Sequence, residues 1–168
     1  VSASGNAVFL TGSSVTQYQV GIDGPVRARS LDSDWVHGSS TAGAVLKRTL
    51  NSVGDTSLQA EYVRVHQRGL AAEEFIRAAL AATQVPAIPK TPIQLPVGST
   101  TLNQDGLAQQ LKIVARMIGA GQKVGMRRQV FLVSMPGFDS HSGQMRDQPG
   151  LMARVALALS YFQSTLTT

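Results

Sequence analysis

The stretch QVFLVS, residues Gln129–Ser134, says more about the fold than any other part of this chain. Its four consecutive apolar residues, Val130 to Val133, are typical of a short strand buried on both faces, as in a parallel sheet. The segments before and after it have helical periodicity, and the alternation of helix, strand and helix favours an α/β architecture. We therefore expect a largely parallel sheet covered by helices.

The flanking helices are predicted from apolar residues spaced three and four apart. Thr56 and Gln59 form a capping-box pattern at the start of a long helix, in which Gly69 marks a kink or a break. Asn103 is expected to cap a second helix and Asp147 a third. The apolar stripes of the three helices are Leu58, Tyr62, Val65, Gly69, Ala72, Ile76 and Leu80; Leu107, Leu111, Val114 and Ile118; and Leu151, Val155, Leu159 and Phe162.

Short β-strands are expected near the N-terminus, at Ala7–Leu10 and Tyr18–Val20, because glycine and serine bound each apolar run. Residues 23–40 are expected to form a loop or lid, followed by a short helix that ends near Gly54. Residues 85–100 hold four prolines and predict a long surface loop, with an interdomain linker as the alternative. We expect residues 1–168 to be a single domain or part of one.

The composition excludes several classes of protein. Hydrophobic residues make up 43% and charged residues 15% of the chain, which fits a globular protein. No apolar run is long enough for a membrane span. The formal charge of +5 comes from scattered basic residues without interleaved aromatics, and this pattern argues against a nucleic-acid partner. The absence of cysteine excludes disulfides and thiolate metal sites.

The candidate functional residues follow the predicted strand. Asp139 and His141 are two residues apart, so in an extended backbone they point the same way, with Ser140 between them. A carboxylate oxygen and an imidazole nitrogen both suit zinc and related divalent ions, although further ligands must come from elsewhere. The alternative is a turn with a capping aspartate and a surface histidine.

Other polar residues give weaker indications. Ser140 and Gln144 could hold a substrate oxygen or hydrogen-bond to a metal ligand. His37, near two aspartates and a tryptophan, is a second candidate ligand, or simply part of a polar loop. His66 lies beside an apolar stripe, which indicates a surface or packing histidine, and Arg127–Arg128 indicates a solvated face.

The segment Arg127–Gln144 resembles part of a family of exported bacterial proteins that carry a domain of unknown function and belong to the alkaline-phosphatase-like superfamily. There a similar strand precedes a Gly-Gly-aromatic-Asp-Thr-His-type loop, which here reads Met135–Gln144. Pro136 and Ser140 stand where the family has glycine and threonine. The opening Gly5–Gly12 and the helices around the loop are also similar to the family.

This resemblance implies a partial alkaline-phosphatase-like sandwich and export by the twin-arginine route to the periplasm or the extracellular space. It implies that Asp139 and His141 bind one divalent ion (zinc, manganese or calcium) that supports hydrolysis of phosphate or sulfate esters. Family members are longer, so the chain is expected to be a segment that is inactive alone and whose partner is the remainder of the parent protein or another chain.

Two alternatives remain beside this hydrolase-like interpretation. The first is a non-catalytic exported scaffold or binding module that keeps the fold only, which the lack of a recognisable nucleophile favours. The second is a basic nucleic-acid-associated domain, which only the net charge of +5 supports.

Overall fold

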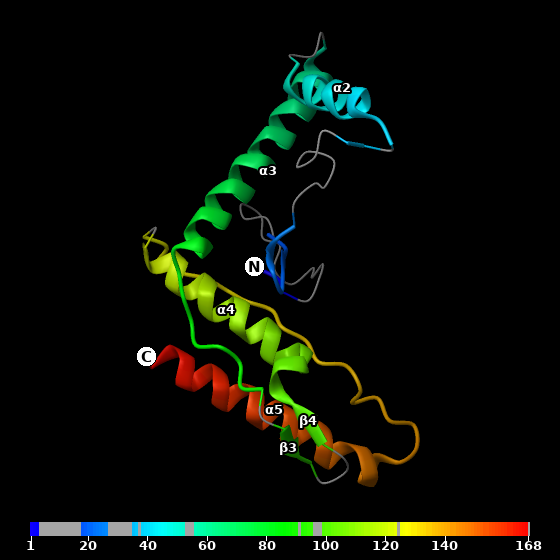
Figure 1. Ribbon diagram of the computed structural model, residues 1–168, viewed down its shortest axis with the longest axis vertical. Coiled ribbons are helices and arrows are strands. Elements are labelled where there is room, and N and C mark those ends of the chain that lie inside the picture. The colour runs from blue at the N-terminus through cyan, green and yellow to red at the C-terminus, as the bar shows by residue number, and fades with distance from the viewer. Residues whose placement is uncertain are drawn as a thin grey trace. The chain divides into compact units, whose positions relative to one another are not determined.

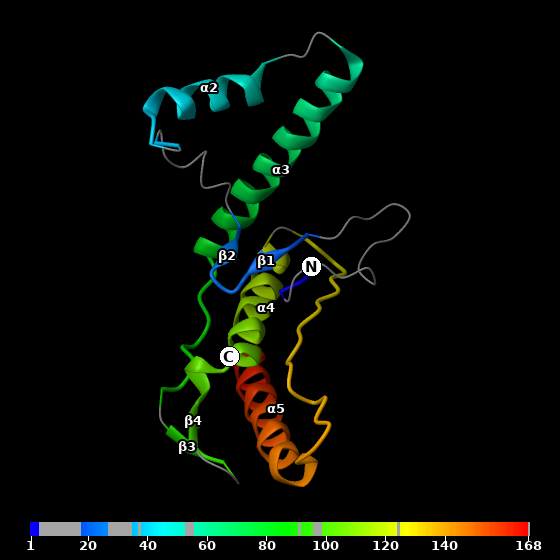
Figure 2. The ribbon, with the colours of Figure 1, turned by 90° about the vertical axis from the view of Figure 1, so that its right-hand side faces the viewer.

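A computed structural model of the chain describes residues 1–3, 18–26, 35–36, 38–52, 56–90, 92–95, 99–123 and 125–167. Its elements, in chain order, are β1 (Val20–Gly21), β2 (Gly24–Pro25), α2 (Ser40–Asn51), α3 (Ser57–Ala81), β3 (Pro92–Gln94), β4 (Ser99–Thr101), the short 3₁₀ helix η2 (Leu102–Gln104), α4 (Gly106–Lys123) and α5 (Gln144–Leu166) (Figures 1 and 2). The predicted strand Ala7–Leu10 and the candidate ligand His37 lie outside the described residues.

The described residues are mainly helical, so the predicted α/β fold, with a largely parallel sheet covered by helices, is wrong. Within the described part of the chain each sheet has two strands, β1 with β2 and β3 with β4. The second pair is antiparallel, with Ile93 opposite Thr100. The described residues therefore do not form the predicted alkaline-phosphatase-like sandwich.

Among the described residues, the apolar run at the centre of the prediction pairs only through an isolated bridge to the N-terminal residues. Leu132 forms a parallel β-bridge with Ser2, and Ser2 forms another with Gln19. The backbone N–H of Leu132 donates to the carbonyl of Val1 at 3.1 Å, and Ala3 donates to the carbonyl of Leu132 at 3.0 Å. A run of four apolar residues in a strand is buried only when other elements cover both faces of its sheet. In the described structure these bridges are isolated, and Val130 is 69% exposed.

The chain divides into two compact units, one formed by residues 1–24 and 79–168 and the other by residues 25–78. The first unit contains α4, α5 and the candidate loop. The second contains α2 and most of α3. Each is described by itself below.

Helix α4 begins at Gly106 because Asp105 caps it, not Asn103 as predicted. One carboxylate oxygen of Asp105 accepts hydrogen bonds from the backbone N–H groups of Leu107 and Ala108, at 3.0 and 3.1 Å. These donors have no partner within the helix, so an acidic cap satisfies them and also suits the positive end of the helix dipole. The other oxygen of Asp105 lies 2.6 Å from Nε of Arg154 on α5.

The core of the first unit lies between α4 and α5. Its buried members come from both helices and from the segments that precede α4; they are Ile88, Leu102, Leu107, Ala108, Leu111, Ala158 and Tyr161. The predicted stripe of α4 is confirmed at Leu107, Leu111 and Val114, all at most 7% exposed. The predicted stripe of α5 is confirmed in part: Val155 and Phe162 pack against the core, whereas Leu159 is 51% exposed.

The segments around the core are tied to it by side-chain hydrogen bonds to the main chain. Tyr161 Oη donates to the carbonyl of Pro86 at 2.8 Å, and Arg116 donates to the carbonyl of Leu80 at 2.8 Å. The carbonyl of Leu80, at the end of α3, also accepts from the backbone N–H of Thr83 at 3.1 Å. The proline-rich segment 85–100 is thus anchored at its start, and it contains β3, which begins at Pro92.

Helix α3 begins as the capping box predicts. The N–H of Gln59 donates to the Thr56 hydroxyl at 3.3 Å, and the N–H of Thr56 donates to the Gln59 side chain at 3.2 Å. The helix continues through Gly69 as one element of 25 residues. Glu73 and Arg77, four residues apart on this helix, form an ion pair at 3.2 Å, and Glu73 is only 9% exposed.

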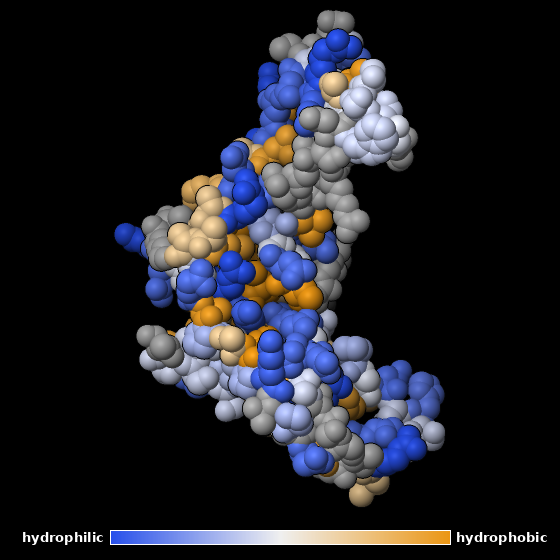
Figure 3. Space-filling view, viewed as in Figure 1, coloured by the Kyte–Doolittle hydropathy of each residue, from blue (hydrophilic) through white to orange (hydrophobic). Residues whose placement is uncertain are grey.

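The first half of the predicted stripe of α3 is not buried in the described structure. Leu58 is 81%, Tyr62 66% and Val65 54% exposed. Exposed apolar side chains are visible as orange patches on the face drawn in Figure 3. Among the described residues, none of the helices combines the length and the hydropathy that crossing a bilayer requires.

Candidate functional site

The candidate loop follows an extended segment that returns along α4 (Figure 1). The Gln110 side chain on α4 fixes the end of this segment: its Oε1 accepts from the N–H of Ser134 at 2.9 Å, and its Nε2 donates to the Ser134 carbonyl at 2.8 Å. A side-chain amide thus makes the two bonds that a neighbouring strand would make. The loop therefore starts from a fixed point on the core.

Two glycines in left-handed backbone conformations bracket the predicted ligands. Gly137 has a φ of 106° and Gly143 a φ of 80°, values that side chains other than glycine rarely allow. A Cβ at Gly137 would also lie 3.2 Å from the Leu151 side chain on α5. Between them the N–H of Ser140 donates to the carbonyl of Phe138 at 3.1 Å, which curls the loop.

Asp139 and His141 lie side by side at the tip of this loop. Oδ1 of Asp139 is 3.4 Å from Nδ1 of His141, and the two side chains are 91% and 89% exposed. With zinc bonds of about 2.0–2.1 Å to each atom, a tetrahedral angle sets two ligand atoms about 3.3 Å apart. The separation therefore suits two ligands of one tetrahedral ion. It also suits an ion pair when the imidazole is protonated.

The remaining ligands of such a site are not among the described residues. No group of three or more histidine, aspartate or glutamate side chains in the described part of the chain could hold a metal ion. Gln144, predicted to hold substrate or support a ligand, donates instead to Gln148 on α5 at 3.1 Å. The structure thus brings together Asp139 and His141 but leaves them open to solvent.

Asp147 lies just beyond the loop but does not cap α5 as predicted. The helix begins earlier, at Gln144, with Gly143 as its N-cap and no side-chain cap. Asp147 instead pairs with Arg146, at 2.7 and 3.1 Å. The hydrogen bonds from Arg146 hold the pKa of the Asp147 carboxyl below its ordinary value.

The remaining candidate residues, Arg127, Arg128 and His66, give weaker support for a functional site. Arg127 and Arg128 are exposed, in keeping with a solvated face. The His66 ring lies against Tyr62, with ring centroids 6.3 Å apart and planes 16° from parallel. Its Nε2 atom is buried and has no hydrogen-bond partner among the described residues. His66 is a packing residue, as the sequence indicates.

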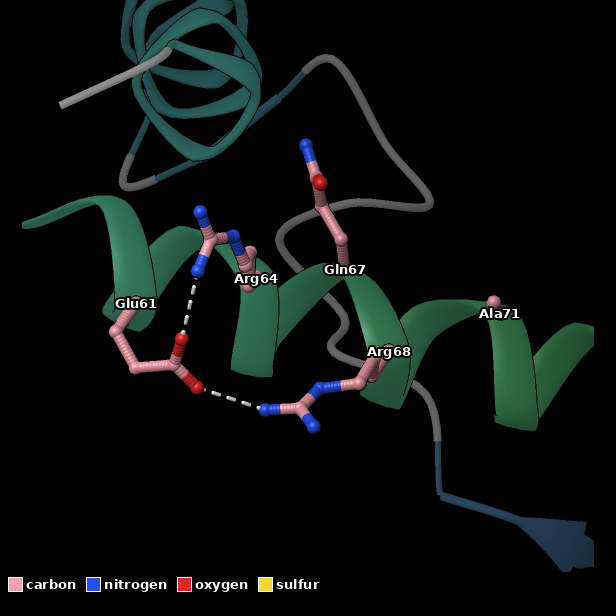
Figure 4. Close-up of a pocket in the computed structure, with 5 residues that line it drawn as sticks. All are labelled: Glu61, Arg64, Gln67, Arg68 and Ala71. Carbon is pink, nitrogen blue, oxygen red and sulfur yellow. Dashed lines mark hydrogen bonds and ion pairs between the residues drawn. The ribbon is translucent and has the colours of Figure 1, made fainter.

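Sequence reasoning missed a charged cluster on α3 (Figure 4). Glu61 accepts from Arg64 at 3.2 Å and from Arg68 at 2.9 Å, and with Gln67 and Ala71 they line a hollow of about 510 Å³. The helical spacing of Glu61 and Arg64 could have indicated the first pair. Both arginine side chains are 70% exposed, so these pairs are surface ion pairs of small energy and form no catalytic arrangement.

Comparison with protein-family models, curated proteins and solved structures finds no match for this chain. The resemblance to exported alkaline-phosphatase-like proteins therefore stays a prediction.

Proposed function

We propose that the loop carrying Asp139 and His141 supplies two ligands of a divalent-metal site whose other ligands come from another segment or chain. The complete site would belong to an exported metal-dependent hydrolase of phosphate or sulfate esters. The observation that carries the proposal is the 3.4 Å separation of Asp139 Oδ1 and His141 Nδ1 on an exposed loop. Zinc, manganese and calcium are the candidate ions.

The chemistry of the pair supports this assignment. An aspartate oxygen and a neutral imidazole nitrogen are common ligands of zinc, and oxygen ligands also suit manganese and calcium. Because both side chains are about nine-tenths exposed, an ion bound by them keeps open positions. A further protein ligand or an ester oxygen can fill such positions, and the ion then stabilises the oxyanion that develops during hydrolysis.

The loop geometry also supports the proposal. The Gln110 clamp at Ser134 holds the base of the loop against α4. A metal site needs ligands whose positions are set before the ion arrives, because ordering them on binding costs conformational entropy. In this proposal the chain alone binds metal weakly and has no hydrolase activity.

The test is a zinc titration followed through the ring protons of the histidines by NMR. We expect the His141 signals to shift first, while those of His66 stay constant. Asp139→Asn, which keeps the shape but removes the charge, should weaken zinc binding at His141 about tenfold or more. His66→Ala is the matched control. Equal zinc affinity in the wild type and in Asp139→Ala/His141→Ala would contradict the proposal.

A second candidate function is a non-catalytic exported scaffold or binding module. The full exposure of the pair, with no third ligand among the described residues, favours it. Hydrolysis of generic phosphate or sulfate esters by the full-length parent, abolished by a chelator and by Asp139→Asn, would exclude the scaffold. Zinc binding at His141 without any such hydrolysis would favour it.

A further inference from the structure

We infer that a hollow in the first unit binds a small metabolite with two negative charges and one ammonium group. The residues that line this hollow are distant in sequence from the candidate loop. The hollow, here called the Asp23 pocket, has a volume of about 260 Å³. Its polar lining consists of Asp23, Lys90, Asn103, Gln109 and Lys112, over an apolar wall that includes Ile88. The inference does not depend on the metal site proposed above.

The pocket draws its charges from three separate parts of the fold. Asp23 lies in the turn between β1 and β2, Lys90 in the extended segment after α3, and Lys112 on α4. Asn103 and Gln109 are joined, since Gln109 Nε2 donates to the Asn103 carbonyl at 2.8 Å. Ile88, on the same wall, is 8% exposed and belongs to the core. The pocket is therefore built on the packed part of the unit.

The charges in the pocket do not neutralise one another. Within the described residues, Asp23 forms no ion pair with Lys90 or Lys112, and neither lysine pairs with another carboxylate. Opposite charges that face one hollow without touching leave space between them for a bridging molecule. A ligand that places an ammonium at Asp23 and anionic oxygens at the lysines would satisfy all three groups.

The size of the pocket narrows the ligand class. Pockets for drug-sized ligands occupy about 300–1,000 Å³, so this volume suits a smaller molecule. Two lysines and one aspartate are complemented by two negative charges and one positive charge. A phosphorylated amine and an amino dicarboxylate share this chemistry, and the lysines can bind the oxygens of either.

The test uses the full chain and isothermal titration with three probes: phosphoethanolamine, L-aspartate and inorganic phosphate. We expect phosphoethanolamine or L-aspartate to bind, and the one that binds identifies the source of the negative charges. Lys112→Met keeps the aliphatic stem and should weaken that binding about tenfold or more, because a charge-assisted hydrogen bond is lost. Arg128→Gln removes one positive charge outside the pocket and serves as the control.

The Asp23→Asn variant distinguishes recognition of the ligand's ammonium group by Asp23 from attraction of an anion to the lysines. It should weaken binding of the amine-bearing probe about tenfold while leaving the affinity for inorganic phosphate equal or higher. Backbone NMR shifts at Ile22 and Asn103 place the bound probe, and circular dichroism confirms that each variant is folded. The inference is overturned if neither amine-bearing probe binds, if Asp23→Asn leaves its affinity unchanged, or if Lys112→Met and Arg128→Gln weaken it equally.

Discussion

Asp105 and Arg154 join the start of α4 to the middle of α5, with Nε of Arg154 2.6 Å from Oδ2 of Asp105. The Asp105 side chain is completely buried and Arg154 is 34% exposed. The same carboxylate caps α4 through its other oxygen. One residue thus secures both the beginning of a helix and the packing of its neighbour.

Removing the Asp105 carboxylate should lower the free energy of unfolding by about 2–4 kcal/mol in Asp105→Ala, because both the cap and the partner of Arg154 are lost. Asp105→Asn keeps an oxygen for the cap and should cost less, by about 1 kcal/mol. Urea denaturation measures both. The control is Glu61→Gln, which removes an exposed ion-pair partner on α3 and should cost less than about 0.5 kcal/mol. Equal losses at positions 61 and 105 would contradict the role given to Asp105.

Gly119 and Gly69 both lie inside helices but differ in their surroundings. A Cβ at Gly119 would lie 2.8 Å from the Thr83 side chain, whereas a Cβ at Gly69 meets open space. Because the β-branched Thr83 has little freedom to move, Gly119→Ala should destabilise the chain by about 1–3 kcal/mol. Gly69→Ala should stabilise it by about 0.5–1 kcal/mol. Thermal unfolding of the two variants should therefore change in opposite directions.

The Gln110 clamp should control the order of the segment that leads to the candidate loop. Gln110→Leu removes both hydrogen bonds to Ser134, so the Ser134 amide should exchange with solvent about 2- to 10-fold faster. Gln122→Ala alters an exposed glutamine on the same helix and should leave that rate unchanged. Hydrogen exchange measured by NMR reads the Ser134 amide directly. An unchanged rate in Gln110→Leu would mean that the clamp does not hold the segment.

Arg146 should be responsible for the lowered pKa of the Asp147 carboxyl. Since the hydrogen bonds from Arg146 lower the pKa of this carboxyl in the folded chain, the pair stabilises the fold above the unfolded-state pKa. That contribution is lost as the pH falls through the lowered folded-state pKa. Arg146→Gln should raise the pKa of Asp147, measured by carboxyl NMR titration, whereas Arg128→Gln should leave it unchanged. The effect on stability is small because the pair is exposed.

The sequence predicts structure correctly where the interactions join residues that are close together in the chain. The capping box at Thr56 and Gln59 needs only residues three apart, and both of its hydrogen bonds are present. The stripe of α4 was also predicted correctly, since Leu107 and Leu111 lie in the core. In both cases the helix itself provides the geometry that the pattern assumes.

The predictions that failed depended on contacts with distant parts of the chain, which a local sequence pattern does not specify. The apolar run from Val130 to Val133 indicates burial, but it does not specify which elements cover its two faces, and Val130 is exposed. The stripe of α3 likewise predicts an apolar face without naming what covers it. For the loop, the spacing of Asp139 and His141 placed two donor atoms close together, 3.4 Å apart. Their role as metal ligands stays a prediction.

Two glycines in left-handed conformations bound the segment that carries Asp139 and His141, so residues 138–142 form a loop segment that can be replaced. Gly137 and Gly143 have left-handed backbone conformations, and the hydrogen bonds between Ser134 and Gln110 anchor the chain before this stretch. Other short sequences can therefore be grafted between Gly137 and Gly143, with α4 and α5 kept as the scaffold.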